Sequence, residues 1–359
     1  MLLIGTDEGI YRWTEGNNWP VFHGLQDRVV IGLASPGAGF VAALDNVGRV
    51  WETGDNGQSW RGVPLPEGLG RASRIAVGGT PASILLAGGG LGVYRRMMGS
   101  TLRRGSPLDL ARRAGPAILT RARSLVNRGG TATAATAPRR ADDLRGWTRV
   151  GAPKVEPSPV APGIDALTVG PGPWFVAVGG QSLYRSEDAG VSWSKVVGLP
   201  ADVHGVVPVA GEPARLYAAT ADGVWASEDA GVTWEERSKG LEAVRHVRVI
   251  ESCPDEPGFL LAGAAPAASA SPRAAARDGL GYGLYESKDA GKSWSRVLRN
   301  FPENPHDDAI ADIKFDPAEP SHAAVAFESG EMWVTLNGGD YWQPFARDIR
   351  SARVLCGIA

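Results

Sequence analysis

The chain has 359 residues, of which 43% are hydrophobic and 21% charged, and its formal net charge is −2, so we expect an ordinary globular protein. It contains no run of about eighteen apolar residues, which excludes a membrane-spanning helix. The N-terminal sequence MLLIGTDEGIYRW lacks the basic start of a secretory signal, so we expect a cytoplasmic protein. Five scattered histidines and two distant cysteines give no zinc spacing, and no glycine-rich phosphate loop opens a helix, so no metal or cofactor is expected.

One short pattern recurs along the chain: an aromatic residue opens it and a tryptophan closes it eight or nine residues later, except in one copy that an insertion splits. The openers are Tyr11, Trp51, Tyr94, Tyr184, Trp225, Tyr285 and Trp333, and the closers are Trp19, Trp60, Trp147, Trp193, Trp234, Trp294 and Trp342. Two apolar runs, bounded by Gly and Pro and rich in β-branched residues, precede the pattern and read as strands. Four short strands repeated at about 40 to 50 residues predict an all-β, seven-bladed β-propeller spanning residues 1–359.

The two ends of the chain are predicted to supply strands of the same blade. Residues 1–5 (MLLIG) resemble a second strand, so the first blade lacks its innermost strand, and residues 351–359 (SARVLCGIA) match the first-strand pattern of the other blades. We therefore expect the terminal strands to pair in one sheet, which closes the ring and removes exposed edges.

Each repeated motif carries an aspartate in the turn before its tryptophan. Its carboxylate can accept backbone N–H bonds of a tight loop, and the glycine two residues later permits a positive φ. We therefore assign a structural role to Asp55, Asp188, Asp229 and Asp289.

The spacing S-x-D-x-G-x-x-W, which stands as Ser186, Asp188, Gly190 and Trp193 and recurs at 227–234 and 287–294, resembles the Asp-box or BNR repeat. That repeat occurs in sialidases, xyloglucanases, sortilin-type receptors and the photosystem II stability and assembly factor family. The resemblance implies the propeller fold, but it does not decide function, because the same repeat serves hydrolases and pure binding proteins.

Residues 97–145 form a predicted insertion in the third blade. The stretch 95–145 holds twelve arginines and three acidic residues, a net charge of +9 that leaves −11 for the rest of the chain. Apolar residues at helical spacing predict two short helices, with basic side chains mostly off the apolar stripe, among them Arg112, Arg113, Arg121 and Arg123. The arm is expected to pack on its own propeller or be partly disordered, to bind a protein partner, or to contact an anionic membrane surface. Nucleic acid is the least favoured ligand, because no aromatic residue is interleaved to stack on bases.

A second insertion, residues 264–282 in the sixth blade, is rich in Ala, Ser and Pro and is expected to be a mobile flap over the usual ligand face. On that face the first-strand starts carry Arg28, Arg74, Arg245 and Arg350, with His204 nearby. Such a ring of arginines could hold a carboxylate, as the resemblance to sialidases implies, or it could simply be a polar, solvated mouth.

The leading functional interpretation is a non-catalytic binding or scaffolding protein, an accessory or assembly subunit of a larger complex. The alternative is a glycoside hydrolase, which needs two carboxylates about 5 to 10 Å apart, and Asp165 with Asp307 or Asp308 is the candidate pair. The resemblance to sialidases implies a tyrosine nucleophile, for which Tyr282 is the one candidate placed to reach the face. However, the arginine motif of that family, Phe or Tyr followed by Arg-Ile-Pro, is missing.

Overall fold

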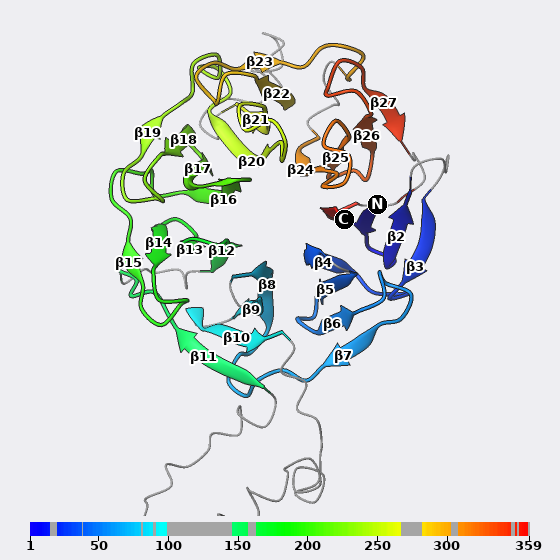
Figure 1. Ribbon diagram of the computed structural model, residues 1–359, viewed down its shortest axis with the longest axis vertical. Helices are drawn as coiled ribbons and strands as arrows, with labels where there is room; N and C mark the ends of the chain where they lie inside the picture. Colours follow the sequence, from blue (N-terminus) through cyan, green and yellow to red (C-terminus); the bar gives the residue numbers. More distant parts are fainter. Residues whose placement is uncertain are drawn as a thin grey trace, which may run out of the picture.

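The computed structural model describes residues 1–359 except 15–19, 38, 80–81, 89–90, 99–145, 157–162, 267–281, 303–307, 346–348, 350–351 and 358–359. Seven four-stranded antiparallel sheets are arranged as blades around a central axis, which confirms the predicted all-β propeller (Figure 1). No helix in the described part of the chain is long and apolar enough to cross a membrane. The helices predicted within 97–145 lie almost wholly outside the described residues and stay a prediction.

In blades 2 to 7 the strands succeed one another outward from the axis in chain order, and in blade 1 the innermost strand comes from the C-terminal end. The innermost strands are β28 (Val354–Gly357), β4 (Val30–Gly37), β8 (Ala72–Gly78), β12 (Ile164–Thr168), β16 (Val203–Val209), β20 (His246–Ser252) and β24 (Ile310–Phe315), for blades 1 to 7. The second strands are β1 (Leu2–Gly5), β5 (Phe40–Asp45), β9 (Ser83–Gly88), β13 (Trp174–Val178), β17 (Glu212–Thr220), β21 (Leu260–Ala265) and β25 (Ala323–Phe327).

The outer half of each blade begins with the aromatic opener of the repeat. The third strands are β2 (Ile10–Trp13), β6 (Val50–Thr53), β10 (Val93–Met97), β14 (Ser182–Ser186), β18 (Gly223–Ser227), β22 (Gly283–Ser287) and β26 (Met332–Thr335). The fourth strands are β3 (Val21–Gly24), β7 (Arg61–Val63), β11 (Trp147–Gly151), β15 (Ser194–Lys195), β19 (Glu235–Glu236), β23 (Ser295–Arg296) and β27 (Gln343–Phe345).

The second strands carry the core. Residues of β13 and β25 are buried along their whole length, because each blade packs one face against the preceding blade and the other against the next. This explains their continuous apolar runs, since a strand covered on both faces has no solvent side that needs polar residues.

The ring closes through the termini as predicted. β1 pairs with β28 in antiparallel register, with Leu3 opposite Cys356, and the backbone N–H of Arg353 donates to the carbonyl of Gly5 at 2.9 Å. The N-terminal amine lies 2.9 Å from the Asp316 carboxylate of blade 7. The first blade therefore combines strands from both ends of the chain.

Two of the closing tryptophans form hydrogen bonds to the preceding blade. Trp147 is fully buried and donates from Nε1 to the carbonyl of Pro64 in the preceding blade at 2.9 Å, and Trp294 donates likewise to Arg237 at 2.8 Å. These hydrogen bonds across the blade boundary make both indole rings part of the contacts that hold the blades together.

The structure shifts the near edges of both predicted insertions. Met97 still belongs to β10, where it is paired with Ser83, and Ala264 and Ala265 belong to β21, where both are buried. Strand pairing and burial therefore extend the two blades over these positions.

Candidate functional site

A cavity of about 880 Å³ occupies the mouth of the central channel. It is lined by residues near the start of the innermost strands, together with Asp202, which precedes β16, and Glu328, which follows β25. The fourth-to-first and the second-to-third connections therefore share this face, as the alternation of strands in a propeller requires. The cavity is the candidate binding site.

The innermost strands direct their side chains into the cavity through one repeated irregularity. In blades 2 to 7 the register with the second strand shifts at one residue near the strand start, and the residues skipped are Ile31, Ser73, Asp165, His204, Arg248 and Ala311. All except Ser73 line the cavity, and Arg74 lines it next to Ser73. A β-bulge leaves one residue out of the ladder and re-aims its side chain, so the bulges determine which residues face the channel.

Arg74 and Asp165 connect blades 3 and 4 within the cavity. Arg74 donates from Nε to the backbone carbonyl of Asp165 at 2.6 Å and from Nη1 to that of Ser73 at 2.8 Å. Water reaches the Arg74 side chain, but the channel wall encloses it, and this partial desolvation lowers its pKa despite the attraction of Asp165. Desolvation raises the pKa of Asp165, and Arg74 offsets part of that rise.

Two histidines lie side by side in the cavity. The rings of His204 and His246 have centroids 4.7 Å apart, tilted by 52°. Nδ1 of His204 lies 2.7 Å from the carbonyl of Val247, which fixes the proton on Nδ1 because a carbonyl can only accept. Nε2 of His204 then points toward Asp202, at 3.6 Å from Oδ2. Burial, followed by repulsion from His204 and Arg248, lowers the pKa of His246 and favours its neutral form.

The other two arginines of the cavity are paired with carboxylates. Arg248 lies 2.9 Å from Glu328 across the boundary between blades 6 and 7. Arg353 donates to Asp7, and these hydrogen bonds raise the pKa of Arg353. Both positive charges therefore have an anionic partner within the protein.

The site residues predicted from the sequence divide into three groups. The structure places Arg74, Asp165 and His204 together in the cavity. Arg28 instead stacks over Trp51 at 4.3 Å and contacts Asp45, and Arg245 is bound by Asp222 and Glu236, so neither lines it. The last group, Asp307, Arg350, Arg112, Arg113, Arg121 and Arg123, lies outside the described residues.

The remaining residues of the hydrolase hypothesis do not line the cavity. The Asp308 carboxylate accepts the backbone N–H of Ser329 at 3.0 Å and thereby caps the turn between β25 and β26. Tyr282 is half-buried immediately before β22 and away from the cavity lining. Asp202 and Glu328 are the other carboxylates of the cavity, and Asp202 is close enough for its charge to contribute to the raised pKa of Asp165.

Arg248, Glu328 and Arg353 are cavity residues that the sequence analysis did not select. Arg245 precedes β20 and Arg248 lies within it, so sequence position favoured Arg245 as the residue at the strand start. The bulge at Arg248 instead directs this side chain into the cavity, and Arg245 lies outside it. A polar residue one or two positions inside the first strand recurs in blades 3 to 6 and was the available signal. Among the residues that the structure describes, no three His, Cys, Asp or Glu side chains are arranged to hold a metal ion.

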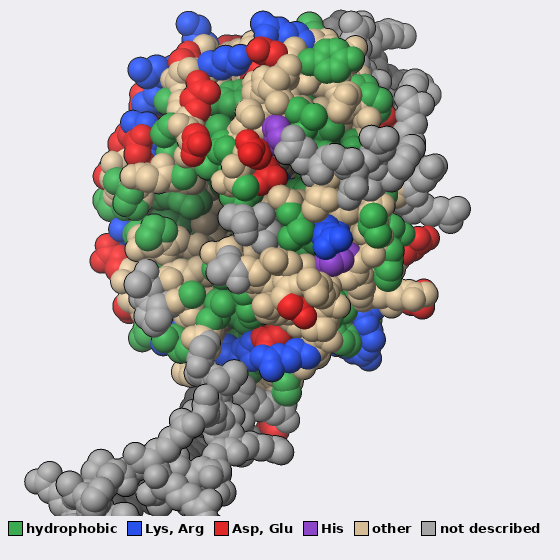
Figure 2. All heavy atoms as spheres, turned by 45° about the vertical axis from the view of Figure 1, so that its right-hand side comes forward, with side chains coloured by type: hydrophobic (Ala, Val, Ile, Leu, Met, Phe, Trp, Pro, Cys, Tyr) green, Lys and Arg blue, Asp and Glu red, His purple; other side chains and the backbone are tan. Residues whose placement is uncertain are grey.

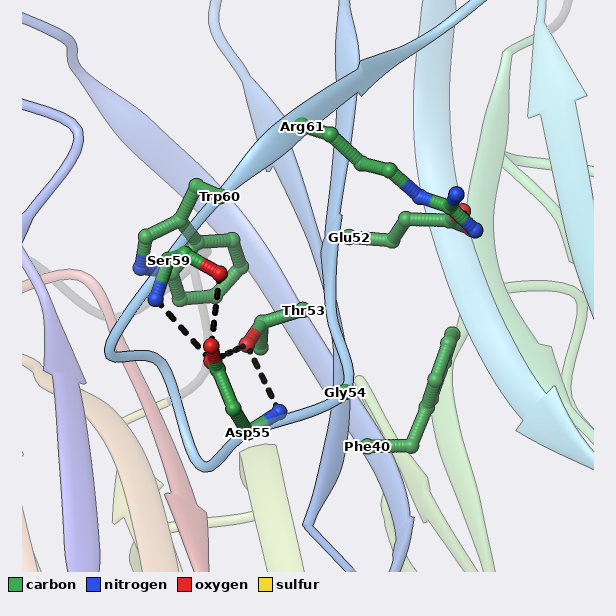
Figure 3. A pocket seen from close by; sticks show the side chains of 8 residues that line it. All are labelled: Phe40, Glu52, Thr53, Gly54, Asp55, Ser59, Trp60 and Arg61. Atoms are coloured by element: carbon green, nitrogen blue, oxygen red, sulfur yellow. Dashed lines mark hydrogen bonds and ion pairs between the residues drawn. The ribbon is translucent and has the colours of Figure 1, made fainter.

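The aspartates of the repeated motif use their carboxylates within their own loops. In blade 2, Asp55 accepts Ser59 N–H at 2.9 Å and Ser59 Oγ at 2.6 Å, and it contacts Thr53 Oγ1 at 2.6 Å (Figure 3). The loops at Asp188, Asp229 and Asp289 repeat these contacts. Hydrogen bonds from the side chain four residues later lower the pKa of Asp55, Asp188 and Asp229 to about 2.

Each of these loops contains two consecutive residues with positive φ. The expected glycine has φ of 87° at Gly190 and 83° at Gly231, and the alanine before it has φ of 55° at Ala189 and 59° at Ala230. The alanine conformation was not foreseen. It costs free energy for a residue with a Cβ, and the hydrogen bonds of the aspartate hold the loop in this form.

The base of the basic insertion is fixed to blade 2. Buried Glu52 forms ion pairs with Arg61 and with Arg96, the second of which belongs to β10 immediately before the insertion. Glu52 and Arg61 lie beside the loop of Asp55 (Figure 3). Arg96 also stacks over Trp147 at 5.5 Å, where the described chain resumes, so both ends of the insertion are held at one place.

Opposite charges alternate over the rim of the propeller. Figure 2 shows Lys and Arg side chains interspersed with Asp and Glu side chains along the upper part of the face that it presents. In blade 5, Arg215 lies 2.9 Å from Glu228 and Arg237 lies 2.7 Å from Glu235. Such exposed pairs contribute little to stability, but they leave this part of the surface locally balanced in charge.

No family model matches the chain, and no curated protein sequence matches it. The structure is similar to that of YCF48 bound to D1 peptide, with 13% sequence identity, 96% of this chain and 90% of that chain covered, and a TM-score of 0.55. YCF48 from Cyanidioschyzon merolae gives 14% identity, coverages of 90% and 87%, and a TM-score of 0.52. A GH74 enzyme of Niastella koreensis gives 14% identity and a TM-score of 0.61 over 95% of this chain, which spans about half of the enzyme, 51%. At these identities the likeness shows the fold alone.

Proposed function

We propose that this propeller is a non-catalytic binding protein that holds a segment of a protein partner in the mouth of its central channel, as an accessory or assembly subunit of a larger complex. The observation that carries the proposal is the convergence of bulged side chains from five separate blades, with Arg74 from a sixth, on one cavity of about 880 Å³. A preformed concave site lined by a few polar groups is the usual form of a ligand site.

The chemistry of the cavity favours binding over hydrolysis. Its charged groups are largely held by contacts within the protein, such as Arg248 with Glu328 and Arg74 with two backbone carbonyls, which makes a rigid recognition surface. The solved structure of YCF48 bound to D1 peptide provides an example of the same fold with a peptide ligand. This supports a protein-derived ligand here.

We include the basic arm, residues 97–145, in the proposal as a second contact surface. Its ten arginines and three aspartates give a charge of +7 against a remainder of −9, and such an asymmetry favours electrostatic attraction to an acidic partner surface. The ion pair of Arg96 with Glu52 anchors the point from which the arm leaves the propeller.

Site-specific photo-crosslinking tests the channel proposal. A photoreactive phenylalanine analogue replaces Ala311, which lines the cavity, and a control carries it at Val197, which is 76% exposed and lies outside the cavity. In native cell extract, the probe at 311 should give a defined protein adduct that the probe at 197 does not give. Absence of an adduct specific to position 311 would refute channel binding.

The arm has its own test. The protein with residues 99–144 replaced by a short Gly-Ser linker is compared with the intact protein in the same crosslinking experiment, at low and at moderate salt. If the arm contributes to partner contact, the protein without it should give a smaller crosslinking yield, and that yield should depend less on salt concentration. Equal yields at both salt concentrations would remove the arm from the proposal and leave the channel site.

One observation favours the glycoside hydrolase as a second candidate. Asp165 has a raised pKa and shares the cavity with Asp202, and a general acid of a glycosidase also has a raised pKa. A screen of oligosaccharides with the wild-type protein and with Asp165→Asn distinguishes the two functions. Turnover that the substitution abolishes would establish the hydrolase, whereas absence of turnover together with the adduct at position 311 favours the binding protein.

A further inference from the structure

The positive side chains of the cavity are engaged by contacts within the protein, whereas two of its carboxylates are not. This difference indicates the chemistry of the ligand. The positive groups are engaged: Arg248 with Glu328 at 2.9 Å, Arg353 with Asp7, and Arg74 with two backbone carbonyls. An anionic ligand would have to compete with these contacts and would also meet the charge of the cavity carboxylates.

The carboxylates of Asp165 and Asp202 lack such contacts. Within the described ranges, no hydrogen-bond donor reaches the Asp165 carboxylate, and the nearest contact of the Asp202 carboxylate is Nε2 of His204 at 3.6 Å. That distance exceeds a normal hydrogen bond. With its proton on Nδ1, the neutral form of the His204 ring would have an acceptor at Nε2 and offer Asp202 nothing to accept.

The fold leaves space for the Asp165 carboxylate but gives it no hydrogen-bond donor. Asp165 is the bulged residue of β12, and its side chain lies over Gly179, where a Cβ would come within 2.5 Å of Oδ2. The absence of a side chain at position 179 therefore lets the carboxylate occupy its place. Partial desolvation in this position raises the pKa of Asp165, which a bound cation would reverse.

We propose that the cavity receives a basic side chain, Lys or Arg, of the protein partner, with its cationic group held between Asp165 and Asp202. The inference rests on the proposed function and identifies the chemical group of the partner, which that function does not specify. An ammonium or guanidinium group supplies several N–H donors, which the two carboxylates lack, together with a positive charge that both attract. The neutral form of His246 beside them adds no further positive charge to the cavity at neutral pH.

The test uses small capped amino acids as probes of the full-length protein. Nα-acetyl-lysine amide is titrated to millimolar concentration, and the imidazole proton signals of His204 and His246 are followed by NMR. The matched probes are the Nε-acetylated form, which lacks the charge, and Nα-acetyl-glutamic acid amide, which reverses it. Only the lysine probe should shift these two histidine signals.

Three cavity variants and one control variant localise the effect. Asp165→Asn and Asp202→Asn should each weaken the lysine probe about tenfold, as expected for loss of a charge-assisted hydrogen bond. Asp222→Asn removes the same charge beside Arg245, outside the cavity, and should leave the affinity unchanged. Gly179→Ala, which displaces the Asp165 carboxylate without changing its charge, should weaken the probe as well.

The outcomes separate this inference from the proposed function. Preferential binding of the glutamic acid probe, lost in Arg74→Met, would make the cavity an anion site and overturn the inference while the channel function stands. A crosslink at position 311 that persists unchanged in an Asp165→Asn, Asp202→Asn double variant would also overturn the inference alone. Failure of every probe together with absence of the crosslink would overturn both.

Discussion

Lys314 of blade 7 donates a hydrogen bond of 2.6 Å to Glu251 of blade 6, below the binding cavity on the innermost strands. Asp312, two residues before Lys314, accepts the backbone N–H of Leu355 in blade 1 at 2.8 Å. Burial would lower the pKa of Lys314, but attraction to Glu251 and Asp312 outweighs it and raises that pKa. One lysine thus compensates two carboxylates where three blades meet.

Lys314→Met should lower the free energy of unfolding at pH 7 by about 3 kcal/mol, because two partly buried carboxylates lose their cation. Burial already raises the pKa of Glu251 and Asp312, and loss of the lysine raises both further. A carboxyl whose pKa is higher in the folded state destabilises the protein at high pH, and this cost disappears as pH falls through the folded pKa. Chemical denaturation should therefore show a smaller deficit at pH 5 than at pH 7.

Lys288→Met is the control for this prediction. Lys288 lies 4.0 Å from Glu286 and its side chain is 50% exposed, so its removal should cost less than about 1 kcal/mol. Equal deficits for the two lysine variants would contradict the central role of Lys314.

Substitution of Asp229 should distinguish its charge from its hydrogen-bonding role. Asn337 occupies the same loop position in blade 7 and accepts the Tyr341 N–H at 3.0 Å, so an amide oxygen can hold this loop. We expect Asp229→Ala to lower the melting temperature by a few degrees and Asp229→Asn to lower it less. Asp340→Asn, in an exposed pair with Arg299, is the control and should change it little.

The pH dependence of the Asp229 variants follows from a depressed pKa. The pKa of Asp229 in the folded protein is about 2, below its ordinary value, so the stabilisation by its ionised form is complete above pH about 4 and is lost as pH falls toward 2. The difference in melting temperature between wild type and Asp229→Asn should therefore shrink over that range. A difference that grows on acidification would exclude this origin.

Arg74→Met should raise the pKa of Asp165 further, because the attraction of the guanidinium offsets part of the desolvation. The carboxyl carbon signal of Asp165 followed by NMR against pH measures it. Arg245→Met, whose guanidinium is bound by Asp222 and Glu236 outside the cavity, should leave the Asp165 pKa unchanged. An unchanged pKa in Arg74→Met would mean that the two groups do not interact.

Gly179→Ala should leave stability nearly unchanged, because the only close contact of the added methyl group is the movable Asp165 carboxylate and Gly179 does not have a left-handed φ. Gly205→Ala is a matched control on β16, since a Cβ there meets nothing within 4 Å. The two variants should melt within about 1 °C of each other, and only Gly179→Ala should alter the carboxyl signal of Asp165. Marked destabilisation by Gly179→Ala alone would show that the carboxylate cannot move.

The fold was predictable because its determinants are local and repeated. The aspartate and glycine of each loop and the apolar runs of the second strands act within a few residues, and recurrence makes them recognisable. The closing pair of β1 and β28 followed from the missing first strand of blade 1. Within the site, Arg74, Asp165 and His204 were found from their positions at first-strand starts, whereas Arg28 and Arg245 were placed there for the same reason and lie elsewhere.

The sequence by itself determined the number of blades, the loops that close them and the way the ring is joined. Only the tertiary structure decided which side chains face the channel and which charges are already paired. Arg245 and Arg248 are separated by two residues, yet one is held by the carboxylates of blade 5 and the other enters the cavity at a bulge. The reason is physical: strand and turn preferences depend on neighbours in sequence, but the partners of a cavity residue come from other blades, and the bulges and the curvature of the ring bring them together.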